Sequence, residues 1–294
     1  MNKYFFLGIL LLFSVFISNT SCKKKKDDPI VTAEPKLIFK FKFDSTQQRL
    51  NNIGQPATIP SGHAAQSPIF NGMSAHYIEL APSAFTALGT GDILYHAVET
   101  TAGGSTAIDF DSSTIATDGE QFFSIPLKNV TPGSYEYIRI SLAYQNYDVK
   151  VRYTSIDFTG TIASFIGFNT YIRTYKPKAI NVTLNTNKLQ GYWAFEAFGI
   201  VTEGQAPAGA TTVPNPIFAS SPIPSGSCVV TGPFDGAPLQ ITGIETKDII
   251  VTVSLSTNKS FEWIDNGDGI YEPDNGTDVV VDMGVRGLIP FIQY

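Results

Sequence analysis

Alternation of apolar and polar side chains is the feature that most restricts how this chain can fold. The stretch KLIFKFKFD, residues 36–44, places every second side chain on the same face of an extended backbone. One face carries the lysines, and the other consists of Leu37, Phe39, Phe41 and Phe43. This pattern predicts a half-buried strand. The same period recurs in residues 74–82, 121–130, 135–145, 147–158, 179–185, 191–199, 238–243, 248–255 and 278–284.

Turn-forming residues separate these stretches, as Pro132 and Gly133 do in TPGSY. Regularly spaced short strands with such turns predict an all-β fold, an antiparallel β-sandwich with Greek-key, immunoglobulin-like connections and few short helices. The sandwich is expected to span residues 36–294 as one domain.

Three segments are less regular. Residues 81–91 fit a short helix or a loop, and residues 161–172 fit a strand or a short helix. Residues 202–226 are rich in Pro, Gly, Ala and Ser, which predicts a long surface loop.

Composition narrows the choice of partner. Charged residues make up 16% of the chain and the formal net charge is −6. Low charge with many polar and aromatic residues is typical of secreted β proteins. Nucleic acid is excluded as a partner because phosphate binding requires a basic patch, and the sequence has none outside the lysines at 23–26.

The N-terminus has the features of a signal peptide. Lys3 precedes an apolar run at residues 4–17, and small polar residues follow at 18–21. A helix needs about 20 apolar residues to span a bilayer, so this run is too short for a permanent membrane anchor. We therefore expect residues 1–21 to be removed.

Cys22 follows this segment directly, and the junction resembles the lipobox of bacterial lipoproteins, with Asn19 where leucine is usual. The resemblance implies that Cys22 is acylated and that residues 22–35 form a disordered tether. Lys26-Asp27-Asp28 resembles the signal that sends Bacteroidota lipoproteins to the outer face of the outer membrane; the alternative is a simple solvated tether. Several acyl chains would hold the protein stably on a membrane, its first expected partner.

Cysteine usage and missing motifs argue against catalysis. With Cys22 acylated, Cys228 has no partner for an intramolecular disulfide, and GSCVVTG predicts a buried small residue at the start of a strand. No histidine follows position 96, so a nearby histidine in sequence cannot activate this thiol. No hydrolase, metalloprotease, nucleotide-binding or dinucleotide-binding motif is present, which favours a protein that is not an enzyme.

The N-terminal part resembles a known family. The segments LIFKFKFD, MSAHYIELAP, GDILYHAVET, STAIDFD and FFSIPLKNVTPGSYEYIRISLAY occur in the order found in MbnP-like proteins, over residues 36–150. Ala97 and Glu99 depart from the family's YHLVD-like segment. These proteins are periplasmic or surface β-sandwiches, in some bacteria linked to copper. The resemblance implies a sandwich and copper handling.

Histidines supply a first candidate metal site. His63, His76 and His96 all lie in the N-terminal half, and Met73 precedes His76 by three residues. Imidazole with thioether suits copper, and imidazole with carboxylate suits zinc or copper(II). The spacing matches no local metal motif, so a site requires His76 and His96 to lie on neighbouring strands with their rings facing inward. The alternative is scattered surface histidines.

The acidic stretch EWIDNGDGIYEPDNGTD, residues 262–278, supplies a second candidate. It resembles the core of EF-hand-like calcium loops and suggests a calcium site made by Asp265, Asn266, Asp268, Glu272 and Asp274. The loop register lacks the acidic residues expected at its first and last positions. A hairpin with Asn-Gly and Asp-Gly turns is the alternative.

Aromatic residues suggest a third candidate. Tyr192, Trp193 and Trp263 could form a platform that stacks on sugar rings, or be core residues. Together, these features predict an outer-membrane surface lipoprotein that binds a metal or another extracellular ligand without catalysis. A carbohydrate-binding or adhesive, structural role is the alternative.

Overall fold

The computed structural model describes residues 34–51, 55–207, 209–211, 213–214, 226–227 and 229–294. Residues 34–294 form one compact unit, and the description below concerns that unit alone. The expected signal peptide, Cys22, the tether up to residue 33 and Cys228 lie outside the described residues.

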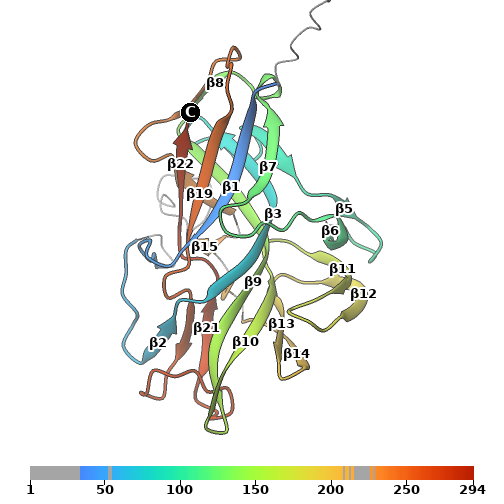
Figure 1. Ribbon diagram of the computed structural model, residues 1–294, viewed down its shortest axis with the longest axis vertical. Helices are drawn as coiled ribbons and strands as arrows, with labels where there is room; N and C mark the ends of the chain where they lie inside the picture. Colours follow the sequence, from blue (N-terminus) through green and yellow to red (C-terminus); the bar gives the residue numbers. More distant parts are fainter. Residues whose placement is uncertain (1–33, 52–54, 208, 212, 215–225, 228) are drawn as a thin grey trace, which may run out of the picture. The chain divides into compact units, whose positions relative to one another are not determined.

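Most of the described strands belong to four sheets, which we call the upper, central, lower and side sheets (Figure 1). The upper sheet has the order β22 (Leu288–Gln293), β19 (Ile249–Ser256), β1 (Lys36–Asp44), β7 (Gln121–Pro126). The central sheet has the order β14 (Ile200–Gln205), β13 (Tyr192–Ala197), β10 (Ile156–Phe165), β9 (Tyr137–Tyr153), β3 (Ile69–Ala81), β4 (Asp92–His96), with β17 (Val229–Pro233) also paired to β9.

The remaining sheets are smaller. The lower sheet has the order β2 (His63–Gln66), β20 (Phe261–Ile264), β21 (Val279–Met283). The side sheet has the order β12 (Val182–Lys188), β11 (Thr170–Tyr175), β6 (Ala107–Asp109), β5 (Glu99–Thr100). Two short ladders pair β8 (Gly133–Tyr135) with β18 (Leu239–Ile241) and β15 (Val213–Pro214) with β16 (Gly226–Ser227).

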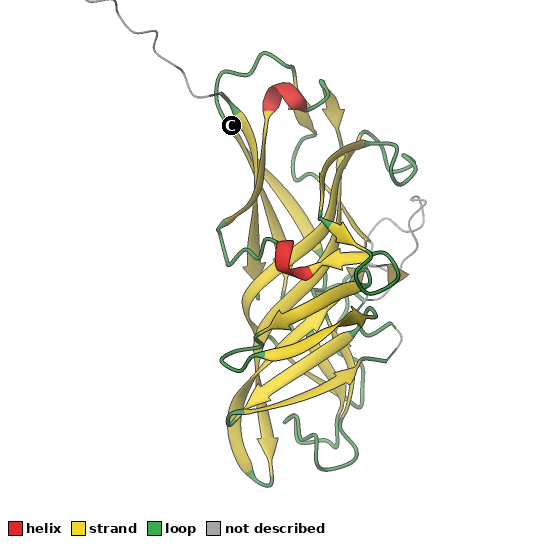
Figure 2. Cartoon of the chain, turned by 90° about the vertical axis from the view of Figure 1, so that its right-hand side faces the viewer, coloured by secondary structure: helices red, strands yellow, loops and turns green. Residues whose placement is uncertain are grey.

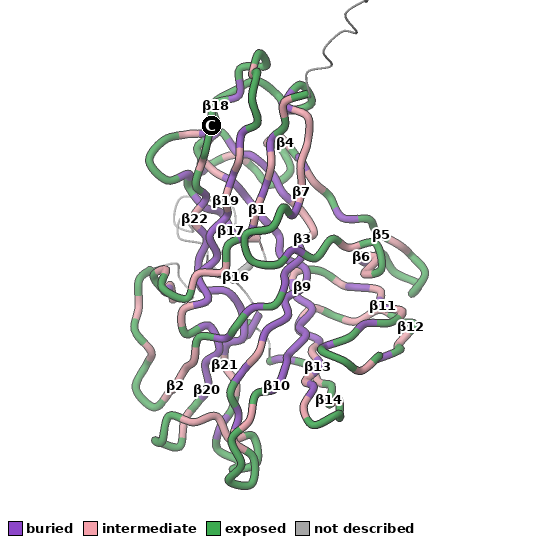
Figure 3. Tube along the Cα trace, viewed as in Figure 1, coloured by how far each residue is buried: buried purple, intermediate pink, exposed green. Residues whose placement is uncertain are grey.

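The central sheet is buried on both faces. One face contributes to the main core together with the upper and lower sheets, and this core includes Phe39, Phe41 and Trp263. The other face packs with the side sheet around Phe165 and Tyr175. Figure 3 shows buried backbone running along the middle of β3, β9 and β19. The predicted sandwich of mainly antiparallel sheets is therefore confirmed, although β1 and β19 pair in parallel.

Strand β9 differs from the sequence prediction in where it ends. The sequence pattern predicts two strands, 135–145 and 147–158, but residues 137–153 form one continuous strand and the turn falls at Thr154 and Ser155. The polar pair Gln145–Asn146 resembles a break, yet both side chains are buried. Asn146 donates to the carbonyl of Pro177, and Gln145 donates to that of Met283. Tertiary partners thus accept from the side-chain amide N–H groups of two residues that resemble a turn.

The structure also shows which conformation the three less regular segments adopt. Residues 161–172 contain the end of β10 and the start of β11, without a helix, and residues 82–91 form turns. The prediction of a loop over residues 202–226 is wrong for its first residues, because β14 extends to Gln205 and pairs with β13. Figure 2 shows two short helical turns, η1 (Phe110–Ser112) and η2 (Leu127–Asn129). Among the described residues, no helix is long and apolar enough to cross a membrane.

Candidate metal centre

Two of the predicted metal ligands meet on neighbouring strands. β3 and β4 pair antiparallel, with Tyr77 opposite His96, so His76 lies beside the end of β4. The rings of His76 and His96 have their centroids 4.7 Å apart. The expected condition of neighbouring strands is therefore met, whereas the expected inward-facing rings are not, because His96 is exposed.

A third ligand comes from the chain that follows β4. The backbone N–H of Ala97 donates to the carbonyl of His76 at 2.7 Å, which holds the chain against β3 before β5 begins at Glu99. Oε1 of Glu99 then lies 2.9 Å from Nε2 of His76 and 3.9 Å from Nε2 of His96. Among the described residues, these three form the only group whose ligand atoms all lie within 4.8 Å of one another.

Neighbouring groups orient both imidazoles. Nδ1 of His96 lies 3.0 Å from the carbonyl oxygen of Ala97. Because a carbonyl only accepts, Nδ1 carries the proton and Nε2 keeps its lone pair, as in many metal-bound histidines. The ring of His76 stacks on Phe168 at 5.0 Å and 15°. His96 is 49% exposed, so the site is open to solvent on that side.

Burial favours the neutral form of His76. Desolvation lowers the pKa of His76 below its ordinary value, and the nearby His96 lowers it further, while the hydrogen bond to Glu99 opposes the shift. A neutral imidazole is the form that binds metal. Nε2 of His76 faces the Glu99 carboxylate, which only accepts, so in the metal-free protein this nitrogen carries a proton that an incoming ion replaces.

The donor set selects a class of ion. Two imidazole nitrogens and one carboxylate oxygen suit Zn²⁺ or Cu²⁺, and the set contains no soft sulfur ligand for Cu⁺. Ligands bound tetrahedrally to zinc lie roughly 3.3 Å apart. The distance from Glu99 to His76 is already slightly shorter than this, and exposed His96 needs to move only a little closer. Three protein ligands leave a further position for water or another molecule.

The other two members of the predicted copper set lie elsewhere. His63, on β2, has its Nδ1 2.6 Å from Oε1 of Glu262. Met73 is fully buried in the main core, where it contributes to packing. The prediction of a single site made by His63, Met73, His76 and His96 is therefore wrong, and no thioether joins the two imidazoles.

Sequence reasoning missed Glu99. In the sequence, Glu99 stands out only as a departure from the family's YHLVD-like segment. The His96-x-x-Glu99 spacing is a signal, but it has meaning only if the chain turns back after β4. The bond from Ala97 to His76 produces that turn, and it is a tertiary contact.

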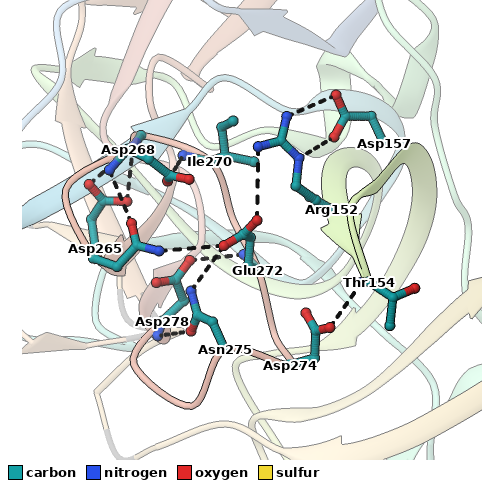
Figure 4. Close-up of polar contacts among 12 residues, drawn as sticks. Arg152, Thr154, Asp157, Asp265, Asp268, Ile270, Glu272, Asp274, Asn275 and Asp278 are labelled. Carbon is teal, nitrogen blue, oxygen red and sulfur yellow. Dashed lines mark hydrogen bonds and ion pairs between the residues drawn. The ribbon is translucent and has the colours of Figure 1, made fainter.

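The acidic loop between β20 and β21 does not gather its carboxylates around a common point (Figure 4). Asp265 accepts from the backbone N–H groups of Gly267 and Gly269, and Asp268 accepts from that of Ile270. Asn266 accepts from the N–H of Asp268. These oxygens close local turns, which is the hairpin-like alternative.

The remaining acidic residues of the loop have partners of their own. Glu272 lies 3.9 Å from the guanidinium of Arg152, and Asp274 accepts from the N–H of Thr154 on the neighbouring hairpin. Among the described residues of this loop, no three carboxylates form a group that could hold a metal ion, so the geometry does not support the predicted calcium site.

The aromatic platform is also wrong. Trp263 is 1% exposed, and Tyr192 is buried with its hydroxyl 2.8 Å from that of Tyr175. Trp193 is half-buried on the opposite face of β13 from Tyr192. Trp193 and Trp263 contribute to the main core and Tyr192 to the core beneath the side sheet, so the three side chains do not form one exposed surface for a sugar.

Comparison with known proteins adds no assignment. No protein-family model matches the chain, and no curated protein or solved structure matches it either.

Proposed function

We propose that this protein is a lipid-anchored metal-binding module of a bacterial outer membrane, in which His76, His96 and Glu99 bind Zn²⁺ or Cu²⁺. The observation that carries the metal proposal is the convergence of three ligand atoms within 4.8 Å from β3, β4 and β5. The resemblance to MbnP-like sandwiches supports a binding role, and the missing catalytic motifs support a role without catalysis.

The lipid anchor rests on sequence. Cys22 follows an apolar run too short to span a bilayer, and the lysines and aspartates after it suit a solvated tether at the cell surface. Mass spectrometry of the protein from membranes is expected to find a mature N-terminus at Cys22 that carries acyl chains. Cys22→Ser should release the protein from the membrane fraction. An unmodified N-terminus, or unchanged membrane retention of the variant, would contradict the anchor.

Metal binding is tested on the mature chain, residues 22–294, carrying Cys22→Ser so that neither lipid nor detergent interferes. Calorimetric titration of the metal-free protein with Zn²⁺ and with Cu²⁺ should show one ion bound per chain. Glu99→Gln and His96→Ala should each weaken binding by at least about 10-fold, because even outer-shell partners of a metal contribute that much. Affinity should fall as the pH is lowered, because protons compete with the ion for the imidazoles.

His63→Gln is the matched control, since His63 is the remaining histidine of the chain and pairs with Glu262 instead. It should bind metal as the parent does. Equal losses in His63→Gln and His96→Ala would show nonspecific binding, and no uptake of either ion would end the metal proposal.

A further inference from the structure

An apolar cleft lies between the central and lower sheets. It has a volume of about 570 Å³ and is lined by β9, β10, β13 and β14 on one side and by β20, β21 and the acidic loop on the other. None of the candidate metal ligands lines it. Its volume falls within the usual range for small-molecule sites.

Aromatic rings dominate the walls of this cleft. Phe158, Trp193, Phe195 and Tyr271 line it and pack only partly into the main core, which leaves ring surface facing the space. Such surfaces favour flat or cyclic apolar groups. Sugars need several polar partners, and this lining provides few.

The turn at the mouth is the second, independent observation. Ala197 pairs with Ile200, so Phe198 and Gly199 alone make the connection between β13 and β14. Both have positive φ, 50° for Phe198 and 73° for Gly199. Asn-Gly is the favoured pair in such a turn, and a bulky residue with positive φ is strained.

Phe198 is strained and is also exposed. Its side chain is 74% accessible, yet its ring contacts Phe158, a wall residue, at 4.6 Å between centroids. Neither turn geometry nor core packing explains phenylalanine here. Strained residues of this kind cluster at ligand sites, where a side chain is retained for what it contacts.

Charge narrows the class of ligand. Asp278 is the one formally charged residue in the described lining, and it is buried, accepting from the backbone N–H of Glu272 at 2.8 Å. The acidic loop adds further negative charge beside it. A ligand with a carboxylate would be repelled, whereas a neutral molecule would not.

We infer that this cleft binds a mainly apolar small molecule that contains a ring and carries no negative charge, and that Phe198 covers it at the mouth. The site is distinct from the proposed metal centre and does not depend on it.

The test uses N-phenylnaphthylamine, a neutral aromatic fluorophore, with the detergent-free mature chain carrying Cys22→Ser. Its fluorescence should rise and saturate at one molecule per chain. Phe198→Asn should weaken binding roughly 2- to 10-fold, as expected for one aromatic contact, while raising the urea midpoint because asparagine suits the turn. Weaker probe binding together with higher stability would indicate that Phe198 serves the ligand rather than the fold.

Ile244→Asn is the matched control, because Ile244 is 82% exposed and does not line the cleft. It should leave probe affinity unchanged. Absence of probe binding, including the case in which another part of the chain fills the cleft, would overturn the inference. An equal loss in both variants would do the same, and displacement of the probe by palmitate would overturn the charge argument.

Discussion

Replacing Arg139 with methionine is expected to lower the free energy of unfolding by about 3–5 kcal/mol. Arg139 on β9 and Glu79 on β3 are both fully buried, with Nη1 of Arg139 3.5 Å from Oε2 of Glu79. Methionine fills a similar space but leaves the Glu79 carboxylate buried without its cation. That uncompensated charge, rather than the value of the ion pair itself, is the main reason for the loss.

The same substitution also releases the loop before β4. Arg139 donates to the carbonyls of Thr86 and Ala87, while Glu79 accepts from the N–H groups of Gly89 and Gly91. The pair thus holds both sides of residues 86–91, and its loss should expose this loop to proteolysis. Urea denaturation followed by tryptophan fluorescence measures the change in stability.

Arg152→Met is the control for Arg139→Met. Arg152 pairs with Asp157 at 2.6 Å on an exposed hairpin, where solvent screens the ion pair, so its loss should change stability little. A loss of similar size in the two variants would contradict the role assigned to burial.

Replacing Trp263 with alanine is expected to destabilise the protein by about 3–5 kcal/mol through the cavity it leaves. Trp263 lies on β20 in the main core, with its ring centroid 6.0 Å from that of Phe261 and 5.6 Å from that of Tyr271. Its Nε1 donates to Asp265 at 3.2 Å, so the substitution also loosens the acidic loop. The expected outcome is a lower urea midpoint.

Ile264→Ala provides the comparison. Ile264 is the next residue on β20, points to the opposite face and is 43% exposed. Its truncation should change stability by no more than about 0.5 kcal/mol, as for most surface positions. If Trp263→Ala retained full stability, Trp263 would have to be a surface residue, and the stacking interpretation would return.

Strand formation was largely predictable, because alternation is a property of neighbouring residues. Residues 36–44 form a strand with Leu37, Phe39 and Phe41 fully buried, as their spacing indicates. The alternation of apolar and polar residues was weakest in β9. This strand is buried on both faces along most of its length, so its polar residues do not identify a solvent-exposed face.

The candidate site depended on information that no local pattern contains. Sequence identified His76 and His96 as residues of the right chemistry, but their meeting requires the register of β3 against β4. Glu99 joins them because a backbone hydrogen bond turns the chain after His96. A slip of one residue in that register would move a ligand to the other face of the sheet.

The sequence by itself determined which residues alternate, several of the turns between strands, and that the N-terminus has the character of an export signal. Only the tertiary structure decided which face of each strand is buried, since that depends on which sheets pack together. It placed Trp263 inside and Phe198 outside, and separated His63 and Met73 from the other histidines. The physical reason is that secondary structure follows from contacts between residues near in sequence, whereas a site is made by side chains that only strand pairing and sheet packing bring together.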